Sequence, residues 1–405
     1  MKQDLRKSLE FFALRRSMFG ILTMAVLIGM GEKMAERFLP VYLLALGSGE
    51  ILVGALNGLD NLLSALYSFP GGYLAERLGS KRALFLFNCL AVLGFLIVIL
   101  IPHWAAVFAG SVFFLSWTAI SLPATMDIVA KSLPKTKRTM GVSMHSLVRR
   151  IPMALGPVVG GVFIVTWGEI AGVRAAFGCA LVMAVVAMIF QQLFIEDDRK
   201  INIDKKEESS QLGFRGLWRA MTPSLRQLLV ADILIRYCEQ IPYAFIAIWC
   251  MKTISHPVDG VEFGTLTAIE MVTAMLVYIP VAYLADKSRK KPFVVMTFVF
   301  FTAFPAVLFF CHSFLWLIPA FVLRGLKEFG EPTRKALIMD LAPEGHKAGM
   351  FGLYYLVRDV VVSVSAFLSG FLWQQGPAVN FGTAFAFGLI GTLWFALKGK
   401  ETESA

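Results

Sequence analysis

The sequence predicts an all-α membrane protein with twelve transmembrane helices in two six-helix bundles. Three observations lead to this fold class. Hydrophobic residues make up 57% of the chain and the mean hydropathy is +0.68, whereas a soluble protein has roughly 45–50% apolar residues. The apolar residues form blocks of about 20 to 28, the length that a helix needs to cross a hydrocarbon core of about 30 Å. These blocks fall into two sets of six that carry matching residues.

The apolar blocks predict twelve spans. They cover residues 17–45, 50–76, 80–101, 105–131, 140–166, 172–195, 225–251, 262–285, 291–311, 314–341, 347–373 and 378–397. The first block is not interpreted as a cleaved signal peptide, because it continues into Glu32–Arg37 and no A-x-A cleavage site follows. The longest polar stretch predicts a cytoplasmic linker at 196–226, between an N-terminal bundle at 1–195 and a C-terminal bundle at 227–405.

Basic residues predict the orientation. Loops after even-numbered spans carry most of the Lys and Arg, so the positive-inside rule places both termini in the cytoplasm. The same asymmetry accounts for the net charge of +10 and gives no reason to expect a nucleic-acid partner. We expect a monomer in the cytoplasmic (inner) membrane. No metal spacing, nucleotide loop or nucleophile–base pair is found, so we expect no cofactor, no metal and no enzymatic activity.

The second half of the chain repeats the first at an offset of about 210 positions. The Pro70–Glu76 segment aligns with Pro280–Asp286, with matching tyrosine, leucine and alanine residues between. Inside the spans, the aligned charged residues are Lys33 with Arg236, Glu36 with Glu239, Asp60 with Glu270, and Arg149 with Arg358. Because each repeat has an even number of spans, we expect a pseudo-two-fold axis along the membrane normal and a substrate site between the halves, near the midplane.

The loop after the second span carries a recognisable motif. From Gly72 to Arg82 it reads Gly-Tyr-Leu-Ala-Glu-Arg-Leu-Gly-Ser-Lys-Arg. It resembles the signature G-x-x-x-D-R/K-x-G-x-R/K-R/K of the major facilitator superfamily, and a degenerate copy begins at Asp286. Gly156–Gly161 resembles the core of that family's antiporter motif, but Ser143 and Pro152 replace its two earlier glycines. The resemblance implies a secondary transporter that works by alternating access. We expect the loop residues to form a cytoplasmic gate with Asp127: Gly72, Glu76, Arg77, Gly79, Lys81, Arg82, Asp127 and Asp286.

Charged residues lie inside the predicted spans, where each costs about 2.5–3.5 kcal/mol at the bilayer centre. They number nine cations and nine acids, so we expect them to pair. Spans one, seven and ten hold most of them, and the family resemblance implies that spans one, four, seven and ten line the central cavity. Helical spacing predicts i, i+3 pairs of Lys33 with Glu36 and Arg236 with Glu239. It also predicts i, i+4 pairs of Arg324 with Glu328 and Lys327 with Glu331.

Two interpretations of these charges stay open. They form paired networks that lock one conformation, or some of them carry protons and substrate. A carboxylate partly removed from water beside a like charge binds a proton more readily, which favours Glu36, with Glu32 one turn away and Glu239 as its counterpart. The remaining proton-coupling candidates are Asp60 and Glu270. The substrate-cavity candidates are Lys33, Arg37, Arg149, Arg236, Lys327, Glu328, Glu331, Arg358, Tyr42, Tyr243 and Trp249.

The leading functional hypothesis is proton-coupled export of an amphipathic organic compound, because 35 Phe and 18 Met supply soft surface for an adaptable pocket. A second hypothesis is uptake of an organic anion by proton symport, with Arg236, Arg149, Arg358 or Lys327 as the anion clamp. A third, from another class, is a membrane sensor or assembly partner without transport. It is disfavoured because the linker is too short for a soluble domain. In all three the bilayer surrounds the chain; protons and a small molecule are partners only in the first two.

Overall fold

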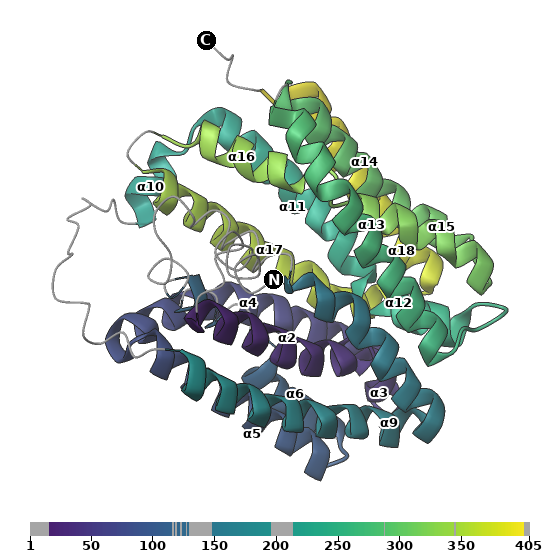
Figure 1. Ribbon diagram of the computed structural model, residues 1–405. Coiled ribbons are helices and arrows are strands. Elements are labelled where there is room, and N and C mark those ends of the chain that lie inside the picture. The colour runs from purple at the N-terminus through teal and green to yellow at the C-terminus, as the bar shows by residue number, and fades with distance from the viewer. Residues whose placement is uncertain are drawn as a thin grey trace, which may run out of the picture. The chain divides into compact units, whose positions relative to one another are not determined.

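The computed structural model describes residues 16–115, 117, 120–121, 124–126, 128, 148–195, 214–286, 288–343 and 346–400. Helices dominate these residues, as Figure 1 shows. Contacts divide the chain into two compact units. Unit 1 comprises Met1–Gly47 and Leu66–Lys206, and unit 2 comprises Ser48–Ala65 and Glu207–Ala405. The predicted bundle boundaries at 195 and 227 stay a prediction.

Seven helices in the described part of the chain are long and apolar enough to cross a membrane. They are Met18–Glu36, Ser80–Leu100, Arg150–Phe194, Gly260–Val277, Lys290–Phe309, Gly349–Gln374 and Pro377–Lys398. The helix at Arg150–Phe194 has 45 residues and covers two predicted spans. Each of the twelve predicted spans overlaps a described helical segment.

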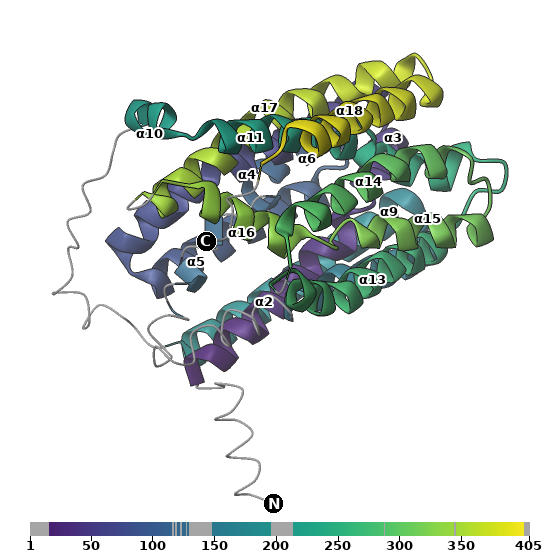
Figure 2. The ribbon, with the colours of Figure 1, turned by 90° about the horizontal axis from the view of Figure 1, so that it is seen from above.

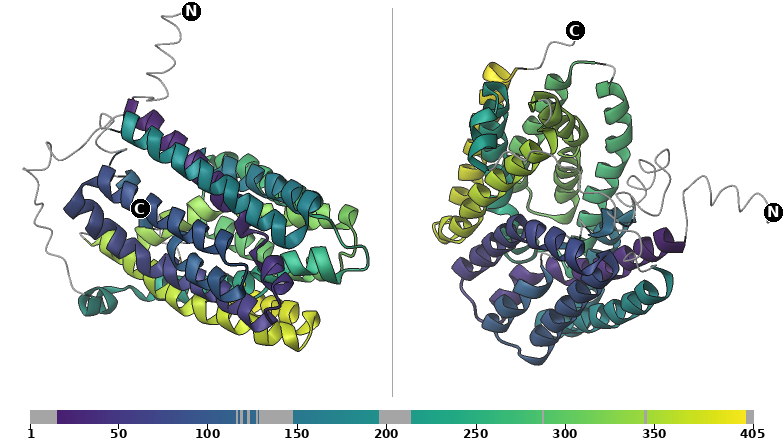
Figure 3. Two further views of the ribbon diagram at one scale, coloured as in Figure 1. Left: turned by 90° about the horizontal axis from the view of Figure 1, so that it is seen from below. Right: turned by 90° about the vertical axis from the view of Figure 1, so that its left-hand side faces the viewer.

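Unit 1 is built on the pairing of its first and last long helices. Its helices are α2 (Arg16–Glu36), α3 (Leu39–Ala45), α5 (Ser80–Leu100), α6 (Trp104–Phe114), α9 (Arg150–Phe194) and the later part of α4 (Glu50–Leu78). Figure 3 shows α2 running alongside α9. A side chain at Gly160 would place its Cβ 2.0 Å from the Met34 carbonyl oxygen. The glycine-rich stretch therefore lets two helices touch, as small residues do in membranes.

A sharp corner joins the fifth and sixth spans within α9. Gly168 has a φ of 78°, in the left-handed region that only glycine adopts without strain. Gly168 alone therefore makes the corner, whereas the predicted span bounds left residues 167–171 between the two helices. Arg174, just after it, donates to the Ile99 carbonyl oxygen from Nε at 2.9 Å and from Nη2 at 2.6 Å. This guanidinium satisfies a carbonyl at the end of α5, as cations do at helix C-termini.

The helix α4 contributes to both units. In its first part, which belongs to unit 2, a Cβ on Gly54 would lie 2.6 Å from the Gly370 nitrogen. Asn61 in the same part donates to the Gln240 side-chain oxygen at 3.1 Å. In its later part, Tyr67 donates to the Val112 carbonyl oxygen at 3.0 Å. One continuous helix thus belongs in part to each unit.

Unit 2 holds the remaining helices, grouped around α11. They are α10 (Phe214–Ala220), α11 (Pro223–Tyr243), α12 (Phe245–Ile248), a π-helical turn (Trp249–Thr253), α13 (Gly260–Asp286), α14 (Lys290–Phe309), α15 (Phe314–Leu326), α16 (Glu331–Leu341), α17 (Lys347–Gln374) and α18 (Pro377–Lys398). Within this unit α11 packs on α17 and α18, and α13 packs on α15 (Figure 2). Thr222 caps α11 by accepting from the Leu225 N–H at 3.2 Å.

Spans one, seven and ten, each predicted as one apolar block, are interrupted in the structure. The first breaks after Glu36 and restarts as α3, with Pro40 in its first turn. The seventh breaks at Tyr243, next to Pro242, and the tenth breaks after Leu326 and restarts at Glu331 with Pro332 in the first turn. Proline has no N–H to donate and its ring clashes with the preceding turn, which favours a helix start or end at these three positions.

Candidate functional site

The three broken spans are also the three richest in charge. A break leaves backbone N–H and C=O groups without helical partners, and membrane proteins tolerate this only where protein or water satisfies them. In each of these spans, charged side chains lie within a few residues of the break. In transporters generally, such discontinuous helices form binding sites.

The end of α2 carries a compact cluster of three charges. Lys33 donates to Glu32 at 3.0 Å and also forms an ion pair with Glu36. The predicted i, i+3 pair of Lys33 with Glu36 is confirmed. The cluster lies against α9, because a Cβ on Gly156 would lie only 2.8 Å from the Lys33 Cβ. The glycine therefore brings α9 directly onto the charged turn.

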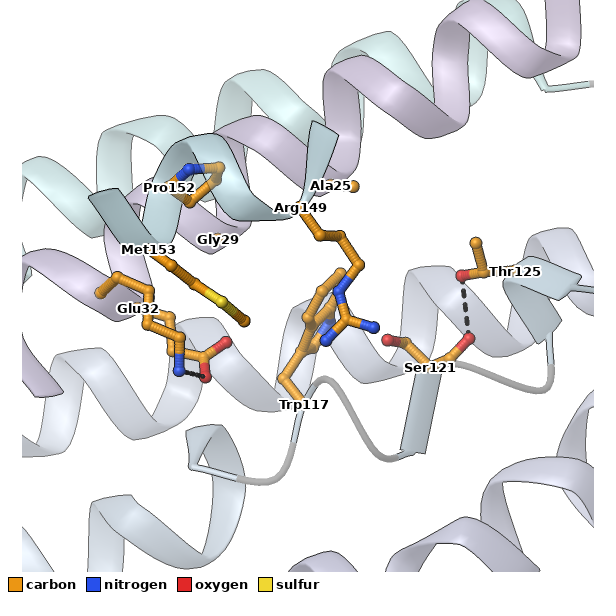
Figure 4. A pocket seen from close by; sticks show the side chains of 10 residues that line it. Ala25, Gly29, Glu32, Trp117, Ser121, Thr125, Arg149, Pro152 and Met153 are labelled. Carbon is orange, nitrogen blue, oxygen red and sulfur yellow. Dashed lines mark hydrogen bonds and ion pairs between the residues drawn. The ribbon is translucent and has the colours of Figure 1, made fainter. Parts of the chain in front are cut away.

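A pocket in unit 1 opens beside this cluster (Figure 4). Its empty space measures about 430 Å³, part of it open to solvent. Arg149 extends from the start of α9 toward Trp117 and Ser121 of the fourth span. The full lining is Ala25, Gly29, Glu32, Lys33, Trp117, Ser121, Thr125, Arg149, Pro152 and Met153. The wall thus combines two cations and one acid with a large aromatic ring and a thioether.

Glu32 has the least solvated carboxylate of the cluster. Its side chain is 4% exposed, against 12% for Glu36. Its Oε1 accepts from Lys33, but its Oε2 is buried and has no hydrogen-bond partner among the described residues. A buried carboxylate oxygen without a donor is costly, and binding a proton removes that cost. Glu32 is therefore better placed than Glu36 to take up a proton.

In unit 2, ten charged side chains form a continuous chain of alternating sign, which we call the charge ladder. It contains five cations and five acids, and each neighbouring pair lies within 3.5 Å. In order, its members are Arg324, Glu270, Lys327, Glu239, Arg236, Glu331, Arg334, Asp232, Arg358 and Asp359. With equal numbers of both signs, the ladder carries no net formal charge.

The first part of the ladder centres on Lys327, in the break between α15 and α16. Its Nζ lies 2.9 Å from Glu239 and 3.3 Å from Glu270. Arg236 lies 2.6 Å from Glu239 at i, i+3, so that predicted pair is also confirmed. The predicted i, i+4 pair of Lys327 with Glu331 is not among the ion pairs of the ladder. The break at 327–330 removes the helical geometry that would bring the two side chains together, and Lys327 contacts Glu239 on α11 and Glu270 on α13 instead.

The second part of the ladder centres on the buried pair of Asp232 and Arg334. Asp232 and Arg334, each 1% exposed, form an ion pair. Arg334 also contacts Glu331 at 2.7 Å, and Asp232 accepts from Tyr354 at 3.1 Å. Arg358 contacts Asp232 at 3.4 Å. These groups tie α11, α16 and α17 together.

Four members of the ladder were not among the predicted site residues: Arg324, Asp232, Arg334 and Asp359. The sequence did signal them, since each is an ionisable residue inside an apolar span. Arg324 also borders a second, smaller pocket of about 270 Å³ in unit 2. That pocket is lined by Cys238, Glu239, Ile246, Phe301, Phe304, Arg324 and Lys327.

The remaining cavity candidates occupy varied surroundings. Tyr42 on α3 is fully buried, and Tyr243 lies with its ring centroid 5.7 Å from the Arg324 guanidinium. The Trp249 indole donates to the Leu308 carbonyl oxygen at 3.2 Å and packs against Phe309. Arg37 lies in the break after α2, Glu328 lies in the break before α16, and Asp60 is half-buried on α4. Their roles stay a prediction.

The structure describes some of the residues that were predicted to form the cytoplasmic gate. Gly79, with a φ of 83°, precedes α5, and the guanidinium of Arg77 lies 4.9 Å from the Tyr73 ring centroid. Lys81 donates to the Gln192 carbonyl oxygen at 3.0 Å, and Arg82 is exposed. The backbones of Gly72, Glu76 and Asp286 are helical. Asp127, and the side chains of Glu76 and Asp286, lie outside the described residues.

The family follows from comparison with known sequences. A family model of the Major Facilitator Superfamily matches residues 21–256 and 228–405. The chain belongs to this family. It is an integral membrane protein of the transporter type, and the resemblance drawn from the loop signature is confirmed. No curated protein matches the sequence.

Solved structures show the same fold at low sequence identity. A peptide transporter POT in complex with alafosfalin is 16% identical, with a TM-score of 0.74 over 94% of each chain. The nucleoside transporter NupG is 11% identical, with a TM-score of 0.76 over 93% of this chain and 99% of that one. A bacterial homolog to the human lysosomal transporter Spinster is 12% identical, with a TM-score of 0.72 over 96% and 98%. The predicted fold class is confirmed.

Proposed function

We propose that this chain is a proton-coupled exporter of an amphipathic organic compound, with Glu32 as the main proton carrier. The observation that carries the proposal is the pocket of unit 1, where a buried acid stands among two cations and an aromatic ring, and one oxygen of this acid has no hydrogen-bond partner among the described residues. Such a pocket offers both a place for a proton and a place for a solute.

The protonation of Glu32 and the binding of the solute would be linked through the ion pairs of Lys33. When Glu32 is ionised, Lys33 pairs with it and with Glu36. When Glu32 is protonated, Lys33 loses its ion pair with that carboxylate, and the charge balance beside Arg149 changes. A solute whose binding depends on that balance then binds in one protonation state and leaves in the other. This exchange is what coupling requires, since a ligand shifts an equilibrium only by its differential affinity.

The walls of both pockets suit an amphipathic solute. Trp117 and Met153 in one pocket, and Phe301 and Phe304 in the other, present soft apolar surface beside cations. In the second pocket the Arg324 guanidinium lies 5.3 Å from the Phe304 ring centroid. Flexible thioethers and aromatic rings accept solutes of varied shape.

The variants Glu32→Gln and Glu36→Gln test the proton role in proteoliposomes. We expect Glu32→Gln to abolish flux driven by a pH gradient while keeping solute counterflow, which needs no proton. Glu36→Gln, which leaves Lys33 without its second acid, should also abolish coupled flux. Glu169→Gln, at the corner of α9, is the matched control and should behave as wild type. Full coupled activity in Glu32→Gln would contradict the proposal.

A second candidate function is proton symport of an organic anion. It is favoured by the excess of cations at the first pocket, where Lys33 and Arg149 face a single acid, Glu32. Protonation of Glu32 would remove one negative charge beside these cations, while Lys33 keeps its ion pair with Glu36. The two functions differ in their dependence on the pH gradient: an outward-directed solute flux driven by inward proton flow supports export, and accumulation with the proton supports symport.

A further inference from the structure

A buried hydrogen-bonded chain runs from the first pocket to the signature loop, within unit 1. The Trp117 indole N–H donates to the Asn88 side-chain oxygen at 2.8 Å. Asn88 donates to the Gln191 side-chain oxygen at 2.7 Å, and Gln191 donates to the Lys81 carbonyl oxygen at 2.7 Å. Trp117 lies in the pocket wall, and Lys81 lies in the first turn of α5, within the signature motif Gly72–Arg82. These hydrogen bonds thus link the fourth, third and sixth spans.

The two side-chain amides in this series of hydrogen bonds are buried, and both take part in hydrogen bonds. Asn88 and Gln191 are both 0% exposed. Asn88 accepts one bond and donates another, and its amide nitrogen also lies 3.6 Å from the Met24 sulfur. A buried amide with every polar group paired has one orientation, because rotating it would leave groups unsatisfied. The indole ring at the end of the chain is therefore held in one position.

We propose that Trp117 contacts the transported solute through the face of its ring, and that Asn88 and Gln191 are positioning residues for that ring. The solute accordingly carries a planar aromatic group that stacks on the indole. Met153 and the Arg149 side chain border the same space, so the acidic or polar part of the solute lies beside the ring. A large ring fixed by its own N–H costs little conformational entropy on binding, which is why tryptophan serves as a rigid contact.

This inference deepens the proposed function and is tested by binding alone. Purified protein in detergent is titrated by calorimetry with 2-naphthoate and with decanoate, which share a carboxylate and differ in the planar ring. The variants are Trp117→Ala, Trp117→Phe, Asn88→Leu and the double variant Asn88→Leu/Trp117→Phe. Asn380→Leu is the matched control, since Asn380 is also 0% exposed but donates to Ser369 and Ile241 in unit 2.

We expect wild type to bind 2-naphthoate more tightly than decanoate. Trp117→Ala should weaken 2-naphthoate binding about threefold to tenfold and leave decanoate binding unchanged, because an aromatic pair contributes a gain of this size. Asn88→Leu should weaken 2-naphthoate binding as well. In the Trp117→Phe background it should cause little further loss of affinity, because phenylalanine lacks the indole N–H that donates to Asn88. Asn380→Leu should leave both affinities unchanged.

Equal affinity of wild type for the two probes, or equal losses for both in Trp117→Ala, would overturn the aromatic class. An Asn88→Leu effect that is additive with Trp117→Phe would show a general structural role and overturn the positioning role. Should Asn88→Leu not fold, Gln191→Leu breaks the next bond of the chain and carries the same comparison. No pH gradient is used, so aromatic binding without proton-driven flux would leave this inference standing and overturn the proposed function.

Discussion

Buried charges in unit 2 depend on one another. Arg334 is among the largest fully buried side chains of the described residues, and it contacts both Asp232 and Glu331. The desolvation of such groups costs several kcal/mol each, and only their mutual contacts offset it. Removing one partner therefore leaves a charge buried without compensation.

Asp232→Asn should lower the stability of unit 2 by about 3 kcal/mol, because it leaves Arg334 and Arg358 without their shared acid. Thermal unfolding in detergent measures the effect. Asp340→Asn is the control: its partner Lys290 is 28% exposed, and a surface pair contributes only about 0–1 kcal/mol. Equal shifts of the two unfolding midpoints would contradict the account of the ladder.

The contact of α2 with α9 positions the charged cluster of unit 1. Gly160 allows the contact, because its α-carbon faces the carbonyl oxygen of Met34, the residue after Lys33. Helices in lipid gain little from apolar burial against each other and depend on close packing instead. A side chain at this point would separate the helices and displace the pocket wall.

Gly160→Ala should destabilise the protein by about 1–3 kcal/mol, since its Cβ meets backbone that cannot move aside. Transport should fall with it. Gly178→Ala in the same helix is the matched control, because a Cβ there meets nothing within 4 Å. The comparison uses unfolding midpoints and flux of the two variants side by side. Similar behaviour of both would argue that α2 and α9 are not held by this contact.

Sequence spacing predicted some pairs of the site and not others. Lys33 with Glu36 and Arg236 with Glu239 were predictable, because i, i+3 neighbours on a helix always lie close. The contact of Lys327 with Glu239 joins α11 to the break before α16, and no spacing rule reaches across elements. The breaks themselves were signalled by Pro40, Pro242 and Pro332. The Trp117–Asn88–Gln191 chain had no sequence signal, since three separate spans supply its residues.

At the scale of the whole molecule, orientation remains an expectation from charge. Basic loops after even-numbered spans predict that both termini and the linker at 196–226 lie in the cytoplasm. We expect a green fluorescent protein fused after Ala405 to be fluorescent and an alkaline phosphatase fused there to be inactive. Fusions after His256, which follows the seventh span, should give the opposite result. Active phosphatase at the C-terminus would contradict the predicted orientation.

The central claim is that solute movement and proton movement are coupled through Glu32. The most direct measurement is proton flux into proteoliposomes, followed with an enclosed pH-sensitive dye, when a solute that stabilises the purified protein is added. We expect the solute to drive proton movement in wild type and none in Glu32→Gln. Solute transport in wild type without any proton movement, or unchanged proton movement in Glu32→Gln, would contradict it.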